Sequence, residues 1–146
     1  VDLAVCALDG LDYILDPADC KEAIRRVYKA LNPGGIFIFD VNTPEKLRAM
    51  DGQVFLDEDD DVYCVWQNTL DKSSDTVQID LDIFEEIEEG IYERMQESFC
   101  ERAYPLSDIK AMLNKAGFET VAVYDELSHD APQENSERLF VIARKK

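Results

Sequence analysis

The sequence has 146 residues, of which 46% are hydrophobic and 32% are charged, a composition typical of one globular domain rather than of a disordered chain. Its formal net charge of −17 repels phosphate backbones and anionic lipid headgroups, so we expect no nucleic-acid and no membrane partner, although a local basic patch is compatible with this total. The apolar runs are too short to cross a bilayer, and no basic segment precedes a hydrophobic one, so the pattern predicts a cytoplasmic protein.

A strand, a helix and a second strand are predicted over residues 1–39. Val1–Leu8 is almost continuously apolar, as in a parallel strand that is buried on both faces. Asp16 suits the N-cap of a helix, and Pro17 suits its first turn. The run Asn32-Pro33-Gly34-Gly35 ends that helix, and Ile36–Phe39 is the second buried strand. Such a unit has a right-handed crossover and parallel strands. The apolar stripe of the helix comprises Cys20, Ala23, Ile24, Val27, Ala30 and Leu31.

Polar residues follow both predicted strands. Asp9 comes after the first strand, and Asp40 and Asn42 come after the second. Because the carboxyl ends of parallel strands meet at one edge of a sheet, where open α/β sheets bind ligands, these side chains are candidates for a ligand crevice. Asp40 and Asn42 equally suit a strand end that leads into a turn at Asn42-Thr43-Pro44.

Residues 54–104 differ in pattern and predict an antiparallel insert of three strands. The strands are VYCVWQNTLD, TVQIDLDIFEEI and IYERMQESFCERAY, joined by turns at Lys72–Asp75 and Glu88–Gly90. Hydrophobic and polar residues alternate in the second strand, which predicts one apolar and one solvated face. The charge run Asp57–Asp61 lacks the glycine and the distal glutamate of an EF-hand loop, so we expect a solvated loop there.

The remaining residues predict a helix and two strands. Ser107 is expected to cap the helix, and Gly117 to end it. Strands are predicted over Glu119–Leu127 and Arg138–Arg144, separated by a polar loop that contains the single histidine, His129, which we expect to be exposed. The four cysteines lack the spacing of zinc ligands, so we expect no metal site and reduced thiols packed as small hydrophobic side chains. They are Cys6, Cys20, Cys64 and Cys100.

Three stretches carry a resemblance to a known family: ALNPGGIFIFDVNTP, ERAYPLSDIKAMLNKAGFETVAVYDE and SERLFVIARKK. They contain one helix that ends in Leu-x-Pro-Gly-Gly before a strand, and another that ends in Ala-Gly-Phe before a closing hairpin. In this order they resemble the C-terminal half of a class I S-adenosylmethionine-dependent methyltransferase of the small-molecule type. The resemblance covers essentially the whole chain, residues 1–146, and implies an α/β fold. That fold is a partial Rossmann-like sheet, with the three-stranded meander of residues 54–104 inserted on the acceptor side.

The resemblance also implies where a site lies. In this family the segment after the fourth strand, which corresponds to the first strand of this sequence, lies beside the cofactor's methionine part and the methyl acceptor. The expected contacts of S-adenosylmethionine are therefore Ala7, Leu8, Asp9, Leu11 and Tyr13. The candidates for the methyl-transfer site and the acceptor pocket are Asp9, Asp40, Asn42, Trp66, Arg102 and Tyr104. A carboxylate there would take the acceptor's proton or hold a cationic amine. Arg102 equally suits a surface ion pair, and Tyr104 equally suits the core.

The family's glycine-rich loop and its ribose-binding acidic residue have no counterpart in the sequence. We therefore expect the chain to be the second half of a longer protein, inactive alone, whose full-length form methylates a small molecule. The alternative is a non-catalytic, methyltransferase-like module that pairs with another chain. A nucleotide-binding oxidoreductase fits the antiparallel insert and the closing hairpin less well. Val1–Leu8 would then lie at a sheet edge, and a homodimer through this strand is one way to cover it.

Overall fold

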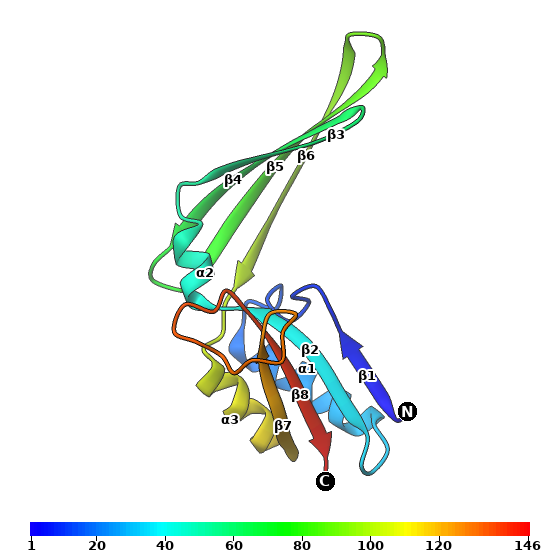
Figure 1. Ribbon diagram of the computed structural model, residues 1–146, viewed down its shortest axis with the longest axis vertical. Helices are drawn as coiled ribbons and strands as arrows, with labels where there is room; N and C mark the ends of the chain where they lie inside the picture. The colour runs from blue at the N-terminus through cyan, green and yellow to red at the C-terminus, as the bar shows by residue number, and fades with distance from the viewer.

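Two four-stranded sheets make up the computed structural model, which describes residues 1–146 (Figure 1). The first sheet and two helices form the body, and the second sheet projects from the body as an arm. The elements in chain order are β1 (Leu3–Cys6), α1 (Pro17–Ala30), β2 (Ile36–Asn42), α2 (Pro44–Ala49), β3 (Val54–Asp59), β4 (Val62–Asp71), β5 (Thr76–Glu88), β6 (Ile91–Arg102), α3 (Leu106–Ala116), β7 (Phe118–Asp125) and β8 (Arg138–Lys145).

The sheet of the body has the strand order β1-β2-β8-β7. β1 and β2 are parallel neighbours, with Leu3 opposite Ile36 and Cys6 opposite Phe39. β8 runs antiparallel to both β2 and β7, so the last two strands close the sheet as a hairpin. The predicted βαβ unit and the partial Rossmann-like architecture are therefore confirmed.

Helix α1 begins and ends where the sequence predicts. The Asp16 side chain accepts a hydrogen bond of 2.7 Å from the backbone N–H of Ala18, and Pro17 stands in the first turn. Beyond the helix, Gly34 has φ +80°, a conformation that glycine adopts without strain. Its N–H donates to the carbonyl oxygen of Lys145 at 3.0 Å, which ties the turn to the end of β8.

The main core lies between the sheet of the body and helices α1 and α3. Full burial of a large aliphatic or aromatic side chain contributes about 1.5–3 kcal/mol, so the buried side chains of this cluster outweigh any single polar contact. All four cysteines are free, as expected, and burial raises the pKa of the Cys20 thiol to about 11. No helix is both long enough and apolar enough to cross a membrane. The core side chains include Ile24, Phe37, Phe39, Val41, Ile109, Leu113, Phe118 and Val141.

The opposite face of the same sheet carries no helix (Figure 1). Exposure alternates along β1, where Leu3 is 53% exposed and Val5 is 60% exposed, while Ala4 and Cys6 pack against the core. The prediction that Val1–Leu8 is buried on both faces is therefore wrong, because only one face of this strand is covered. The prediction that the strand lies at a sheet edge is confirmed, since β2 is its only neighbour.

The arm has four strands, in the order β3-β4-β5-β6, rather than the three that the sequence predicts. The strand that the sequence analysis does not predict is β3, which includes Asp57–Asp59 of the charge run Asp57–Asp61. These side chains are exposed, and the backbone of Asp57–Asp59 pairs with Val62–Cys64 of β4. The predicted solvated loop is thus reduced to a tight turn at Asp60, where φ is +36°.

Two further boundaries differ from the sequence prediction. Asn42 ends β2, and Thr43 and Pro44, expected in a turn, instead open helix α2, with the Thr43 side chain accepting from the N–H of Lys46 and Pro44 in the first turn. Ser107 does not cap α3, because it lies inside the helix; Pro105 occupies the N-cap and makes no side-chain hydrogen bond. Gly117 ends α3 in the left-handed conformation, as predicted.

Candidate functional site

The candidate site begins at a tight turn after β1. Leu8 and Asp9 have φ values of +58° and +50°, in the left-handed region that aspartate tolerates better than leucine does. The turn brings the backbone N–H of Asp9 to 3.1 Å from Asp40 Oδ2. Asp40 and Asn42 do not follow β2, as the sequence suggested, but form its last residues, and both are 2% exposed.

Arg138, the first residue of β8, joins the ends of the two parallel strands. Its guanidinium donates to Asp40 Oδ2 at 2.7 Å and to Asp9 Oδ2 at 2.9 Å. The register of the sheet explains this position, because Arg138 lies directly opposite Asn42. A planar guanidinium holds two carboxylates in a fixed geometry, so Arg138 orients both candidate acids.

Asn42 is the centre of a second set of hydrogen bonds. Its amide nitrogen donates to Asp9 at 2.7 Å and to Glu101 at 3.3 Å, and its amide oxygen accepts from Lys46 Nζ at 2.7 Å. Its backbone N–H donates to Asp12 Oδ2 at 2.8 Å. β1, β2, α2 and the end of β6 therefore meet at one side chain.

Three carboxylates of this network crowd together. One oxygen of each of Asp9, Asp12 and Glu101 lies within 4.8 Å of those of the other two. Asp12 is fully buried, and its Oδ1 accepts no hydrogen bond. Burial raises the pKa of Asp12 to about 8; the charges of Asp9 and Glu101 act in the same direction and the N–H of Asn42 opposes them. Burial and the charge of Asp9 also raise the pKa of Glu101, against the lowering effect of Lys46.

The residues expected beside the cofactor divide into exposed and buried ones. Ala7 and Leu8 lie on the surface, and Tyr13 is 49% exposed with its ring stacked on Phe99, at 5.5 Å between centroids. Of these three, Tyr13 lies beside Glu101. Leu11 is 4% exposed and packs in the core, so it supports the site from below rather than lining it.

The side chains of Arg102 and Tyr104 bind the loop after β1 rather than the carboxylate groups of the cluster. Arg102 donates a hydrogen bond of 2.9 Å to the carbonyl oxygen of Leu15 and lies over the ring of Tyr104, so its partners are a carbonyl and an aromatic ring rather than the expected carboxylate. Tyr104 is 3% exposed, and its hydroxyl donates to the carbonyl oxygen of Ile14. Both side chains therefore fix this loop. Of the two roles expected for Tyr104, acceptor-pocket residue or core residue, its burial fits the core.

A cavity of about 550 Å³ lies at the base of the arm. Trp66, the candidate for the acceptor pocket, lines it together with Lys46, which also binds Asn42 of the carboxylate network. His129 is exposed and packs edge-on against Tyr124, as expected for a loop residue.

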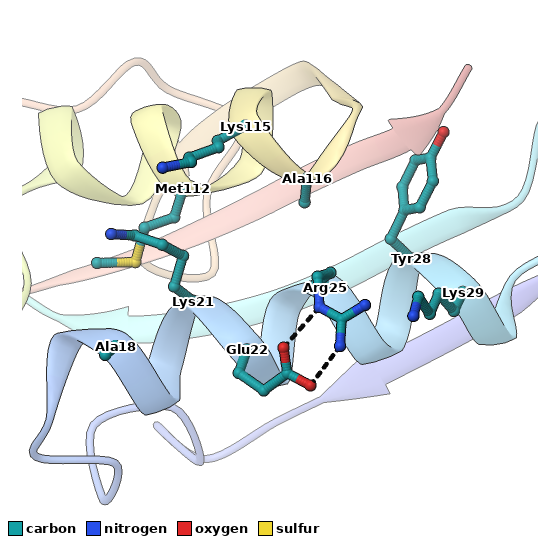
Figure 2. A pocket seen from close by; sticks show the side chains of 9 residues that line it. All are labelled: Ala18, Lys21, Glu22, Arg25, Tyr28, Lys29, Met112, Lys115 and Ala116. Carbon is teal, nitrogen blue, oxygen red and sulfur yellow. Dashed lines mark hydrogen bonds and ion pairs between the residues drawn. The ribbon is translucent and has the colours of Figure 1, made fainter.

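A different recess, of about 440 Å³, lies between α1 and α3 (Figure 2). Lys21, Lys29 and Lys115 line it, and Arg25 is paired with Glu22, whose pKa the arginine hydrogen bond lowers to about 2. This is a local basic patch in a chain of net charge −17. It shares no residue with the carboxylate network.

No family model matches the chain. Among curated proteins, the "Putative methyltransferase YqeM" of Bacillus subtilis (strain 168) is 30% identical over 145 residues, which are 99% of this chain and 58% of that protein. Among solved structures, an S-adenosylmethionine-dependent methyltransferase from Clostridium acetobutylicum ATCC 824 is 31% identical, with a TM-score of 0.90 over 99% of this chain and 58% of its own. The resemblance to S-adenosylmethionine-dependent methyltransferases is confirmed.

The chain spans 59% and 58% of the lengths of the curated methyltransferase relatives that it matches. A more distant neighbour, CalS10, is an amino pentose methyltransferase from Micromonospora echinaspora, solved with S-adenosylmethionine bound. It is 17% identical, with a TM-score of 0.75 over 99% of this chain and 58% of its own, and it shows the shared fold. S-adenosylmethionine, the cofactor that the family resemblance implies, is the one named for these neighbours.

Four residues of the carboxylate network were missed by the sequence analysis: Asp12, Lys46, Glu101 and Arg138. Arg138 had a usable signal, because a closing hairpin places the start of the last strand beside the end of β2. Lys46 was missed together with helix α2. Glu101 ends a strand of the arm, and nothing local in the sequence indicates that this end returns to β1.

Proposed function

We propose that this chain is the acceptor-side portion of an S-adenosylmethionine-dependent methyltransferase that methylates a small molecule. The observation that carries the proposal is the joined network at the carboxyl ends of β1 and β2, where Arg138 holds Asp9 and Asp40 together. Ligands bind at this edge of parallel sheets, and the likeness to a methyltransferase with a TM-score of 0.90 supports the same placement.

The residues after β1 suit the cofactor's methionine portion. S-adenosylmethionine, when bound, supplies an electrophilic methyl group. Ala7, Leu8 and Tyr13 are exposed and would contact the cofactor, while Asp9 faces the acceptor. Alignment of the two reactants contributes up to about 7–11 kcal/mol in such reactions, so a rigid edge fixed by Arg138 and Asn42 is the main contribution of these residues.

The cofactor site is proposed to be incomplete in this chain, because the matched methyltransferases are longer by some two fifths of their length. Calorimetry with S-adenosylmethionine tests this directly. We expect no binding tighter than about millimolar by this chain and a markedly tighter constant for the protein translated from the extended reading frame. Micromolar binding by residues 1–146 alone would contradict this proposal, because it would show that these residues already form a tight cofactor site.

The catalytic proposal has its own test in the extended protein. Asp40→Asn should lower the rate of methyl transfer to the acceptor at least tenfold, because it loosens Arg138 and the turn at Asp9, which together fix the geometry of this edge. Asp82→Asn, on the arm and paired only with Arg94 and Gln96, is the control and should be neutral. Equal rates for the two variants would argue against a reaction at this edge.

A non-catalytic module that pairs with another chain is the second candidate. The exposed edge strand β1 favours it, since such an edge offers unpaired backbone groups to a partner. An extended protein that associates through β1 but binds no S-adenosylmethionine would support the module over the enzyme. A small-molecule acceptor is a prediction of the enzyme candidate alone, and a cytoplasmic location is a prediction of both candidates.

A further inference from the structure

We infer that the acceptor of the proposed reaction is an amine, bound as its ammonium ion by the cluster of Asp9, Asp12 and Glu101. The inference deepens the proposed function and rests on it for the methyl transfer itself. The binding step stands on this chain's own residues and is measurable without the cofactor.

The charges at the site leave room for a cation. Arg138 makes ion pairs with Asp9 and Asp40, but neither Asp12 nor Glu101 has an ion-pair partner. Asp12 is fully buried and Glu101 is 6% exposed. A buried carboxylate such as that of Glu101 is costly without a cation, so a positively charged ligand that reaches this cluster gains its charge compensation.

The second observation that supports a cation at this cluster is the unpartnered oxygen of Asp12. Its Oδ2 accepts from the backbone N–H of Asn42, while its Oδ1 is shielded from solvent and accepts nothing. An oxygen of this side chain lies within 4.8 Å of oxygens of Asp9 and Glu101. An ammonium group has several N–H donors, which can bridge acceptors at such spacings. The side chain of Asp9 is 15% exposed.

The orientation of Asn42 favours an amine over a metal ion. Lys46 donates to the amide oxygen of Asn42 at 2.7 Å, which turns the amide nitrogen toward Asp9 and Glu101. A hard cation would require Asn42 to present its oxygen instead. The side-chain amide of Asn42 already donates N–H groups to the carboxylates of Asp9 and Glu101. These carboxylates are therefore oriented to accept N–H donors.

An aromatic wall adjoins the carboxylates. The stacked rings of Tyr13 and Phe99 stand next to Glu101, whose charge contributes to the raised pKa of Tyr13 after burial. Cations are attracted to aromatic faces, whereas a neutral alcohol gains no such attraction. The net charge of −17 also raises the local concentration of cations around the chain.

The cluster can also make the amine nucleophilic. The N–H bond of the ammonium breaks, its electron pair stays on nitrogen, and the proton forms an O–H bond with the carboxylate of Glu101. The raised pKa of Glu101 makes it a better proton acceptor than an ordinary carboxylate. The amine then carries the free lone pair that attack on a methyl group requires.

The test is a titration of the chain with benzylammonium, followed by NMR of the side-chain carboxyl carbons and of Tyr13. We expect saturable shifts at Asp9, Glu101 and Tyr13 with benzylammonium, and none with benzyl alcohol, which has the same ring without the charge. Glu101→Gln should weaken binding at least tenfold, whereas Glu97→Gln, exposed on the same strand, should leave it unchanged.

Each outcome decides the inference. Equal shifts with the alcohol, or shifts with magnesium chloride and none with benzylammonium, would overturn it. If Glu101→Gln fails to fold, the comparison of amine and alcohol on the unchanged chain still decides. Amine binding without methyl transfer by the extended protein would refute the proposed function but not this site, and methyl transfer to alcohols without amine binding would do the reverse.

Discussion

Arg138 is the residue on which the geometry of the site depends. Replacing it by methionine leaves Asp40, 2% exposed, without its cation. Removal of one partner of a buried pair costs about 3–5 kcal/mol, and because the guanidinium is 25% exposed we expect the lower end of that range. Urea denaturation at pH 7 measures the free energy of unfolding of Arg138→Met.

The matched control for this prediction is Arg144→Met, on the same strand. Arg144 pairs with Glu119, and both side chains are about half exposed. Exposed pairs contribute about 0–1 kcal/mol, so this variant should unfold close to the unchanged chain. Similar losses for the two variants would mean that Arg138 contributes no more than a surface pair.

Asp12 makes stability depend on pH. Its pKa is raised from 3.8 to about 8 by burial, so the folded state holds the proton more tightly than the unfolded state does. Its contribution to stability is therefore full below about pH 4 and is lost as the pH rises toward 8, with a slope of at most about 1.4 kcal/mol per pH unit.

Asp12→Asn isolates this effect, because asparagine keeps an oxygen for the N–H of Asn42 but does not titrate. Urea unfolding of both proteins at pH 5, 6, 7 and 8 gives the difference between their unfolding free energies at each pH. We expect the unchanged chain to lose stability relative to the variant as the pH rises. A difference that stays constant across this range contradicts the assignment.

Among the elements, α3 ends at a glycine that serves two purposes. Gly117 has φ +104°, and a Cβ there would lie 2.8 Å from the ring of Tyr28, which Phe118 and Lys145 hold in place. Gly34, φ +80°, has open space around it. Alanine in the left-handed region costs about 1–2 kcal/mol at either position, so Gly117→Ala should lower the melting temperature more than Gly34→Ala.

A double variant separates the two causes. If Tyr28→Ala is added to each glycine variant, the extra loss at Gly117 should largely disappear, because the obstructing ring is gone. An extra loss that persists would trace to the backbone alone.

The sequence predicts an element well where local chemistry and periodicity agree. The helix from Asp16 to Ala30 and the left-handed end at Gly117 follow from capping residues and an apolar stripe. Residues 43–49 were misread, because Thr43-Pro44 suits a turn and a helix start equally. β3 was missed because its exposed acidic side chains look like a loop, and only pairing with β4 makes them a strand.

The part of the site that the sequence predicts consists of the residues at the ends of the two neighbouring parallel strands. Asp9, Asp40 and Asn42 were brought together by the rule that parallel strands end at one edge, and the structure places them in one network. Arg138 was overlooked although the closing hairpin indicates its place beside β2. Glu101 could not be found in this way, because its position depends on the return of the arm to the body, which no local pattern encodes.

At the scale of the whole molecule, the uncovered edge predicts self-association. Sedimentation of this chain should show a mass that rises with concentration, as β1 pairs with its copy. Val5→Lys places a charge on that edge and should shift the chain toward monomer. Val121→Lys, at a site 52% exposed on the opposite edge strand β7, should change nothing. A clean monomer of the unchanged chain at high concentration rules out the homodimer.

The open face beside β1 also suggests a practical use. Leu3, Val5 and Ile38 line one surface of the sheet that no helix shields. If the remaining segment of a longer enzyme seats there, the two pieces can be produced separately and tethered to proteins of interest. Turnover would then report on whether the tethered proteins meet, and a bare sheet would become one half of a complementation sensor.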